Sequence, residues 1–192
     1  MKNTIKGTRT EKNLMAAFAG ESQTFNRYSY FAEAARKEGY EQIANIFLDT
    51  ANNERTHARA FFQYLEGGGV EMTATFPSGA ASDTKTNLKA AVAGENAAWT
   101  LHYEDFARIA REENFPEIAS TFKHIAVAEK FHEDRFKRLM DNLGKNEVFK
   151  KNMSVKWHCT NCGYVLEGKE VPRLCPACQS PQAFYEVLAE NY

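Results

Sequence analysis

Apolar residues recur at alternating steps of three and four along four stretches of this 192-residue chain. Such spacing places the apolar side chains on one face of an α-helix. The four stretches are residues 10–38, 41–66, 84–113 and 116–143. A segment rich in Thr, Ser, Gly and Ala, residues 70–83, separates the first pair from the second. The pattern predicts a mainly α fold in which two helical hairpins form an antiparallel four-helix bundle.

A Glu-x-x-His pair occurs once in each hairpin. Glu54-Arg-Thr-His57 in the second stretch recurs 75 residues later as Glu129-Lys-Phe-His132 in the fourth. A helix places residues three apart on one face, so each pair offers a carboxylate and an imidazole to a single metal centre. Two such pairs with two further glutamates are the ligand set of a di-iron site in a helical bundle.

The repeat shifts by one residue within the third stretch. Glu21 matches Glu95 at an offset of 74, whereas Tyr28 and Tyr103 are 75 residues apart. One extra residue therefore lies between Glu95 and Tyr103. A helix usually absorbs a single insertion as a π-bulge, and such bulges are frequent at functional sites. We therefore predict a π-bulge in the third helix.

Four glutamates stand where the apolar face of each helix calls for a hydrophobic residue. An ionised carboxylate buried alone is costly, so it must be paired, protonated or bound to a metal. If only one helix carried such a glutamate, its side chain would be expected to reach solvent at the edge of the bundle. Four glutamates at matching positions instead favour a metal site. The predicted ligands are Glu21, Glu54, His57, Glu95, Glu129 and His132. Carboxylates with only two imidazoles select iron or manganese over structural zinc.

The remaining histidines and two tyrosines have different expected places. His102 and His124 have no glutamate three residues before them, so we expect ordinary helix residues. His158 lies outside the bundle, beside the first cysteine. Tyr28 and Tyr103 follow Glu21 and Glu95 by about two turns. They can donate hydrogen bonds to ligand carboxylates or to a bound oxygen species, or they can be amphipathic core residues.

All four cysteines lie in the last part of the chain. They form two Cys-x2-Cys pairs separated by 12 residues, Cys159 with Cys162 and Cys175 with Cys178. Four thiolates at this spacing predict a tetrahedral metal site in a small β-ribbon. Zinc ribbons and mononuclear iron sites share this pattern, so the spacing alone does not select the metal. A redox metal site in the same chain favours iron.

Charge and hydropathy exclude several classes of protein. The chain carries 24 basic and 25 acidic residues, which argues against binding to nucleic acid or acidic lipid. Residues 1–12 are polar and do not resemble a signal peptide, and no apolar run is long enough for a membrane span. Clustered cysteines without an export signal favour metal binding in a reducing cytoplasm.

The order and spacing of these motifs resemble those of the rubrerythrin family. The residues that carry the resemblance are Gly20-Glu21, Glu54–His57, Gly94-Glu95-Asn96, Glu129–His132, Cys159–Tyr164 and Leu174–Cys178. The resemblance implies a ferritin-like di-iron bundle over residues 1–146, followed by a linker and a rubredoxin-like domain over residues 147–192. It also implies reduction of hydrogen peroxide to water. The six glutamate and histidine ligands would bind two irons, and the four cysteines would bind a third iron that relays electrons.

The resemblance also implies partners. The electron donor would be a rubredoxin or an NAD(P)H-dependent reductase. His132 precedes Leu143 by 11 residues, or roughly 17 Å along a helix, so one chain's relay is far from its own di-iron site. A head-to-tail homodimer would bring the relay of one chain beside the di-iron site of the other. The competing functions are ferritin-like iron oxidation or storage, and non-enzymatic metal binding with a structural zinc ribbon.

One position departs from the family pattern. Similar proteins carry a further glutamate three residues after the one matching Glu95, where it exchanges with the first histidine ligand as the irons change valence. This chain has Ala98 at that position. We therefore expect His57 or a water molecule to hold that iron position in both valence states.

Overall fold

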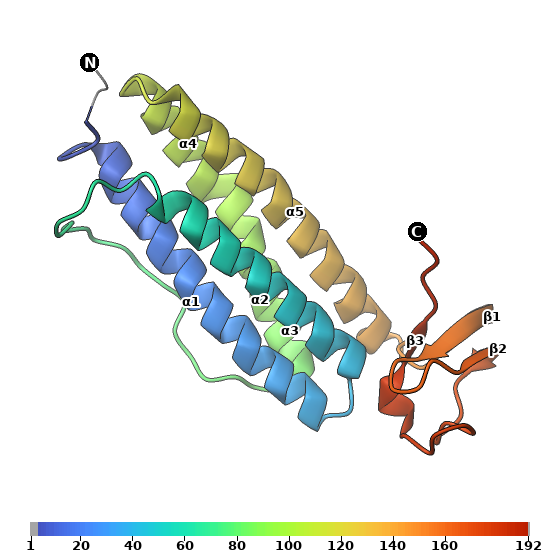
Figure 1. Ribbon diagram of the computed structural model, residues 1–192. Coiled ribbons are helices and arrows are strands. Elements are labelled where there is room, and N and C mark those ends of the chain that lie inside the picture. Colours follow the sequence, from blue (N-terminus) through green and yellow to red (C-terminus); the bar gives the residue numbers. More distant parts are fainter. Residues whose placement is uncertain (1–3, 192) are drawn as a thin grey trace.

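The computed structural model describes residues 4–191 as a helical bundle followed by a small β module (Figure 1). The first three residues of the polar N-terminal segment lie outside the described part of the chain. The bundle elements are α1 (Arg9–Lys37), α2 (Glu41–Phe62), α3 (Thr84–Ala97), the π-helical turn η1 (Ala98–His102), α4 (Tyr103–Glu112) and α5 (Pro116–Gly144). The β module contains β1 (Lys150–Cys159), β2 (Val165–Glu170), the short 3-10 turn η2 (Gln182–Phe184) and β3 (Tyr185–Val187).

The helix boundaries follow from local sequence signals, with one difference from expectation. Thr8 caps α1 by accepting a hydrogen bond from the Glu11 backbone N–H, and Asp83 caps α3 in the same way. The second helix ends at Phe62, four residues before the expected end. Beyond it, the Tyr64 hydroxyl lies 2.9 Å from the Thr121 hydroxyl, and Gly67 has a φ of 80°. Between the end of α2 and Gly67, the N–H groups of Tyr64 and Leu65 donate to the carbonyls three residues earlier, so the chain continues as tight turns.

The helices pack as two hairpins joined by a long crossover, residues 63–83. α1 packs mainly against α2, whereas α5 packs against α3, η1 and α4. The crossover runs along α1, as Figure 1 shows. The Gln23 side chain donates a 2.6 Å hydrogen bond to the Pro77 carbonyl, and the Thr84 N–H donates one of 2.9 Å to Glu38. The predicted ferritin-like arrangement of helices is confirmed.

Two apolar layers fill the bundle, one on each side of its middle. The first contains Leu14, Phe61 and Phe122. The second contains Phe47 and Phe136, whose ring centroids are 5.0 Å apart. Along α2, Phe47 and Phe61 are each seven residues from Glu54, so the seam glutamates lie between the two layers. None of the helices within residues 4–191 has the length and apolar character needed to cross a membrane.

The β module packs against one end of the bundle. Its three antiparallel strands lie in the order β2-β1-β3 around the fully buried Trp157. The rings of Tyr40 and Phe149 stack at 6.0 Å where the module meets the bundle. Contacts of α2 with η2 and β3 continue this interface. The cysteine pairs are therefore held beyond the ends of α2 and α5.

Replacement of Phe47 by alanine tests the second apolar layer. The ring is fully buried against Tyr28, Phe31 and Phe136. We expect Phe47→Ala to lower the free energy of unfolding in urea by about 3–5 kcal/mol, because it leaves a cavity. The matched control Phe131→Ala, at a site 68% exposed, should change it by less than about 0.5 kcal/mol. Equal losses in the two variants would contradict this account of the core.

Candidate metal centres

Six glutamate and histidine side chains converge in the middle of the bundle. They form two sets of ligand atoms, and within each set all the atoms lie within 4.8 Å of one another. One set is Glu21, Glu54, His57 and Glu129, and the other is Glu54, Glu95, Glu129 and His132. All six residues of the predicted di-iron site are brought together. Glu54 and Glu129 belong to both sets.

The shared glutamates contact both histidines. His57 Nδ1 lies 3.1 Å from Glu54 Oε2 and 3.0 Å from Glu129 Oε1. His132 Nδ1 lies 3.0 Å from Glu54 Oε1 and 2.9 Å from Glu129 Oε2. Each shared carboxylate therefore directs one oxygen toward each set. The geometry is that of a pair of carboxylates available to two metal ions at once.

Two oxygens of the shared glutamates accept no hydrogen bond within residues 4–191. These are Oε1 of Glu54 and Oε1 of Glu129, both shielded from solvent. Each lies beside a histidine Nδ1, but without hydrogen-bond geometry. A buried carboxylate oxygen without a donor is costly unless a cation binds it. This observation, together with the oxygen-rich donor set, fits a pair of iron ions at this site.

The two tyrosines donate hydrogen bonds across the hairpins, and their rings also belong to the two core layers, so both expectations for them hold. Tyr28 on α1 donates to Glu95 Oε1 on α3, and Tyr103 on α4 donates to Glu21 Oε1 on α1. Each tyrosine therefore serves the glutamate of the opposite hairpin. Burial, followed by the neighbouring carboxylates, raises the pKa of both phenols well above the usual value. The two hydroxyls stay protonated and act as donors.

The extra residue of the third helix forms a π-helical turn, so the predicted bulge is confirmed. The turn η1 lies between Glu95 and Tyr103 and begins at Ala98. These two residues are eight apart, whereas Glu21 and Tyr28 are seven apart. The wider turn brings Glu95 and Tyr103 onto the same inner face despite the insertion.

Glu133 anchors the π-helical turn to α5, a role that the sequence pattern did not reveal. Its buried carboxylate accepts hydrogen bonds from Trp99 Nε1 at 2.6 Å and Asn96 Nδ2 at 3.0 Å. Lys137 Nζ lies 2.6 Å from it as an ion-pair partner. The only sequence signal is an acidic residue directly after His132. Its two donors lie on α3 and η1, which hairpin periodicity does not identify.

Asn53 orients His132, which is a second contact that the sequence pattern did not reveal. Its Oδ1 lies 3.2 Å from His132 Nε2, so it can accept the proton of that ring nitrogen. With the proton on Nε2, Nδ1 would be free to bind a metal ion held by the shared carboxylates. A partner on the outer nitrogen is the usual way in which proteins fix the tautomer of a histidine ligand.

Burial and neighbouring charges shift the pKa values of the cluster in opposite directions. Burial and then Glu129 and Glu54 raise the pKa of Glu21, while burial and then Glu54 and Glu129 raise that of Glu95. Burial opposes the shifts of the other groups, but the histidines lower the pKa of Glu54 to about 2. Contacts with Glu129 and Glu54 likewise raise the pKa of His57 to about 10. Burial thus disfavours the ionised forms of Glu21 and Glu95, as expected of carboxylates placed to bind cations.

A cavity of about 530 Å³ opens onto this cluster. It lies between α1 and the α3–η1–α4 segment, and residues 72–77 of the crossover cover it. Glu21, Glu95 and both tyrosines are among its lining residues. The cavity therefore gives a small molecule access to Glu21 and Glu95, the two glutamates that are not shared between the ligand sets.

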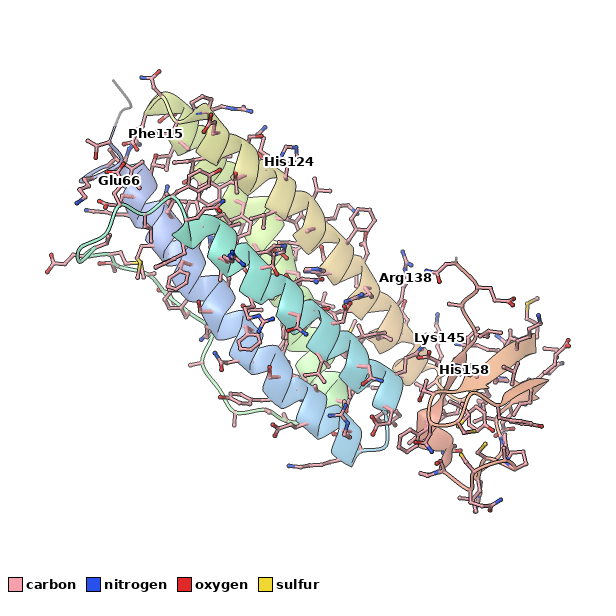
Figure 2. All side chains as sticks on the ribbon, viewed as in Figure 1. Glu66, Phe115, His124, Arg138, Lys145 and His158 are labelled. Atoms are coloured by element: carbon pink, nitrogen blue, oxygen red, sulfur yellow. The ribbon has the colours of Figure 1, made fainter. Side chains whose placement is uncertain are left out.

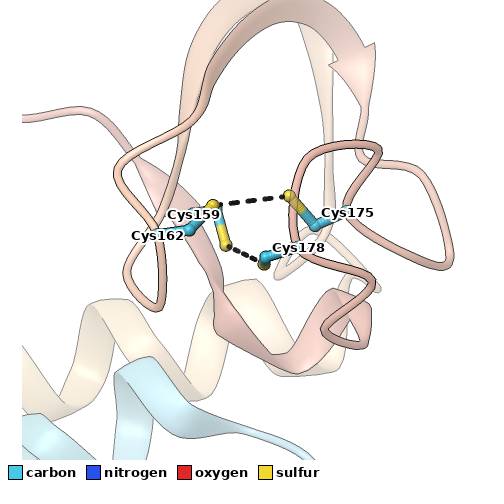
Figure 3. Close-up of side chains that lie close together, drawn as sticks. All are labelled: Cys159, Cys162, Cys175 and Cys178. Atoms are coloured by element: carbon cyan, nitrogen blue, oxygen red, sulfur yellow. Dashed lines mark hydrogen bonds between the residues drawn. The ribbon is translucent and has the colours of Figure 1, made fainter.

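The four cysteines form a second cluster in the β module, and none of them is in a disulfide (Figure 3). The Cys159 and Cys178 sulfurs are 3.9 Å apart, and those of Cys162 and Cys175 are 3.7 Å apart. A tetrahedron of thiolates about 2.3 Å from a metal has edges of about 3.8 Å. The sulfur positions fit a four-coordinate metal ion.

Two similar backbone turns hold these sulfurs. The N–H groups of Gly163 and Gln179 each donate a 2.8 Å hydrogen bond, to the carbonyls of Cys159 and Cys175 respectively. Both residues have positive φ, 79° and 62°. Hydrogen bonds between Cys178 and Ser180 lower the pKa of the Cys178 thiol to about 6, which favours the thiolate that a metal requires.

The remaining histidines belong to neither cluster of ligands. His124 projects outward from α5, and His158 lies in the β module, 4.0 Å from Glu186 (Figure 2). His102 ends the π-helical turn and lines the cavity. None of the three belongs to either glutamate–histidine set.

Comparisons with known proteins agree with both clusters. The rubrerythrin family model matches residues 12–140, and the model of the rubrerythrin rubredoxin-like domain matches residues 157–186. The rubrerythrin of Porphyromonas gingivalis is 50% identical over 192 residues, covering 100% of this chain and 96% of that protein. The rubrerythrin of Nitratidesulfovibrio vulgaris is 52% identical over 188 residues, covering 98% of each chain.

Solved structures give the same fold. Fully reduced, all-ferrous nigerythrin superposes with a TM-score of 0.64 and 28% identity, covering 97% of this chain and 92% of that one. A bacterioferritin of Desulfovibrio desulfuricans matches with a TM-score of 0.62 and 19% identity, covering 72% and 82%. At that identity the second match supports the ferritin-like fold alone.

The pKa shifts of the histidines predict how stability depends on pH in chelator-treated protein. Folding raises the pKa of His57 to about 10 and that of His132 to about 9, from an ordinary value of 6.5. Their contribution is complete below pH 6.5 and is lost as the pH rises through 9 to 10. The raised pKa values of Glu21 and Glu95 act in the same direction. We expect urea unfolding at pH 10 to need less free energy than at pH 6, by on the order of 3 kcal/mol.

A double variant provides the control for other alkaline titrations. In His57→Gln/His132→Gln the difference in the free energy of unfolding between pH 6 and pH 10 should shrink, because the two histidines no longer titrate in this window. A wild-type stability that is constant or rises toward pH 10 would contradict the assigned contacts.

Proposed function

Since this chain belongs to the rubrerythrin family, we propose that it is a non-haem di-iron peroxidase that reduces hydrogen peroxide to water. The family consists of oxidoreductases that use iron, and the donor sets of both clusters fit that metal. The observation that carries the proposal is the presence, on one chain, of a buried carboxylate–histidine cluster and a four-sulfur site.

The six residues divide naturally between two irons. Glu54 and Glu129, whose oxygens face both histidines, would be shared. Glu21 with His57 would complete the first position, and Glu95 with His132 the second. When bound, the iron pair supplies Lewis acidity and the electrons for cleavage of the O–O bond.

The protein's own groups position the reactants and hold protons. The hydroxyls of Tyr28 and Tyr103 fix the orientation of Glu95 and Glu21 and keep a proton at each Oη. The cavity under the crossover admits the peroxide beside these two hydroxyls. Above and below, the aromatic layers with Phe47 and Phe122 keep bulk water from the shared carboxylates.

We propose that the four-cysteine site holds a third iron and relays electrons between subunits. His132 lies 12 residues before the end of α5 at Gly144, about 18 Å along the helix, and the cysteines lie beyond that end. A head-to-tail homodimer would place one chain's Cys162, which is exposed, beside the partner's glutamate–histidine cluster. The donor would be a rubredoxin or an NAD(P)H-dependent reductase in the cytoplasm, where cysteines stay reduced.

Two other functions remain distinct alternatives. A ferritin-like iron-oxidising or storage protein would use the same bundle but has no need of the cysteine module. A non-enzymatic metal-binding protein would carry zinc in the four-sulfur site. A four-sulfur site in the same chain, which suits a one-electron iron, supports the peroxidase over both alternatives.

Iron content and peroxide turnover test the proposed function together. We expect three irons per chain, a red ferric-thiolate absorption, and consumption of hydrogen peroxide with NAD(P)H, a reductase and rubredoxin. Replacement of one ligand in Cys162→Ser should remove the red colour and lower turnover with this donor system at least tenfold. The iron of the bundle should stay, because the bundle has its own core.

The control and the contrary outcomes are clear. Cys162→Ser reduced directly with dithionite should still consume one equivalent of peroxide, since its glutamate–histidine cluster is intact. Zinc in the four-sulfur site would favour the non-enzymatic alternative. Iron oxidation without peroxide turnover would favour the storage protein.

Ala98 leads to a prediction about the redox cycle. It stands where similar proteins have the glutamate that replaces the first histidine ligand. Without that carboxylate, we expect His57 or a water molecule to occupy the same iron position in crystals of oxidised and reduced protein. An exchange of protein ligands at that iron between the two crystals would contradict this expectation.

A further inference from the structure

The cavity above the glutamate–histidine cluster is much larger than hydrogen peroxide requires. Its volume is about 530 Å³. A water molecule, which has one oxygen atom against the two of hydrogen peroxide, occupies about 30 Å³. The cavity is also elongated. Its lining follows α1 from Lys12 to Tyr28, which is about 24 Å of helix at about 1.5 Å per residue.

The stretch of the cavity between Lys12 and Glu21 is apolar. Ala16 and Ala17 on α1, Phe106 and Ile109 on α4, and Met72 of the crossover all belong to its lining. The crossover is held close at this point, since a Cβ at Gly20 would lie 3.7 Å from the Phe76 ring. A covered, apolar passage of this kind suits an alkyl chain.

A positive and hydrogen-bonding end lies opposite the carboxylates. Lys12 is exposed and forms no ion pair within residues 4–191. Asn13 Nδ2 is shielded from solvent and has no acceptor in that same range. Arg9, by contrast, is occupied by Glu112 at 3.0 Å and Glu113 at 3.2 Å. Within the described residues, Lys12 and Asn13 thus offer an ammonium group without an ion-pair partner and an amide donor without an acceptor to an anion.

The distance between the two ends sets the shape of the ligand. Lys12 precedes Glu21 by nine residues, about 14 Å along α1. A ligand that spans it must carry its reactive group well along an alkyl chain and its anionic group at one end. This is the chemistry of a peroxidised long-chain carboxylic acid.

We propose that this protein also reduces long-chain organic hydroperoxides that bear a carboxylate. The carboxylate binds Lys12 and Asn13, the alkyl chain lies along Ala16 and Phe106, and the hydroperoxide group reaches Glu21 and Tyr103. The O–O bond breaks as two electrons and two protons convert the hydroperoxide into the alcohol and one water. The assignment rests on the proposed function, because the electrons are those that the same donor chain supplies.

Equilibrium binding of the product tests the site without turnover. The probe is 13-hydroxyoctadecadienoic acid, titrated into the iron-loaded full chain by calorimetry, with its methyl ester as the uncharged comparison. We expect saturable binding of one acid per chain and at least tenfold weaker binding of the ester. Lys12→Glu should weaken binding of the acid at least tenfold. The matched control Lys89→Glu, exposed on α3 and outside the cavity, should leave it unchanged.

Turnover then tests the substrate assignment. The ratio of kcat/KM for the C18 hydroperoxide to that for hydrogen peroxide should fall at least tenfold in Lys12→Glu and in the cavity-filling variant Ala16→Phe, but not in Lys89→Glu. Absence of saturable binding, or equal losses in Lys12→Glu and Lys89→Glu, would overturn the proposal while hydrogen peroxide turnover leaves the peroxidase intact. Binding of the acid without reduction of any peroxide would overturn both the peroxidase and the substrate assignment.

Discussion

The burial of four carboxylates in the middle of a small helical bundle is the constraint on which the rest of the structure depends. Glu54 and Glu129 are almost inaccessible to solvent, and Glu21 and Glu95 nearly so. Two histidines cannot balance four ionised carboxylates, so the cluster either takes up protons or binds cations. The aromatic layers that enclose the cluster raise the cost of an ionised carboxylate further, because they exclude water that would otherwise solvate it. Stability and chemistry therefore have one origin here.

Much of the fold and of the ligand set could be predicted from local spacing. Helical periodicity identified the four stretches, since each helix buries one face, and the three-residue spacing placed Glu54 with His57 on one side of a helix. The change of offset from 74 to 75 located the π-helical turn, because a continuous helix has few other ways to absorb one residue. These features depend on residues that are near one another in the chain.

What the sequence did not reveal depends on contacts between distant segments. Tyr28 donates to Glu95 and Tyr103 donates to Glu21, each across the two hairpins. To predict these hydrogen bonds, one must know how the hairpins face each other. The hydrogen bonds that anchor η1 to Glu133 also join segments that are distant in the chain, and the early end of α2 was not predicted either. The cavity was also hidden, because the crossover that covers it has no periodic pattern to fix its course.

The crossed tyrosine contacts have a consequence for how the protein responds to iron supply. Each half of the duplicated bundle provides one unshared glutamate, but the phenol that steadies it belongs to the other half. Neither half alone can offer a complete binding site, so metal capture and docking of the halves are linked equilibria. Loss of iron therefore removes an attraction that acts across the seam between them. In a cell that lacks iron, we therefore expect the seam between the two halves to open more readily and to become more accessible to proteases.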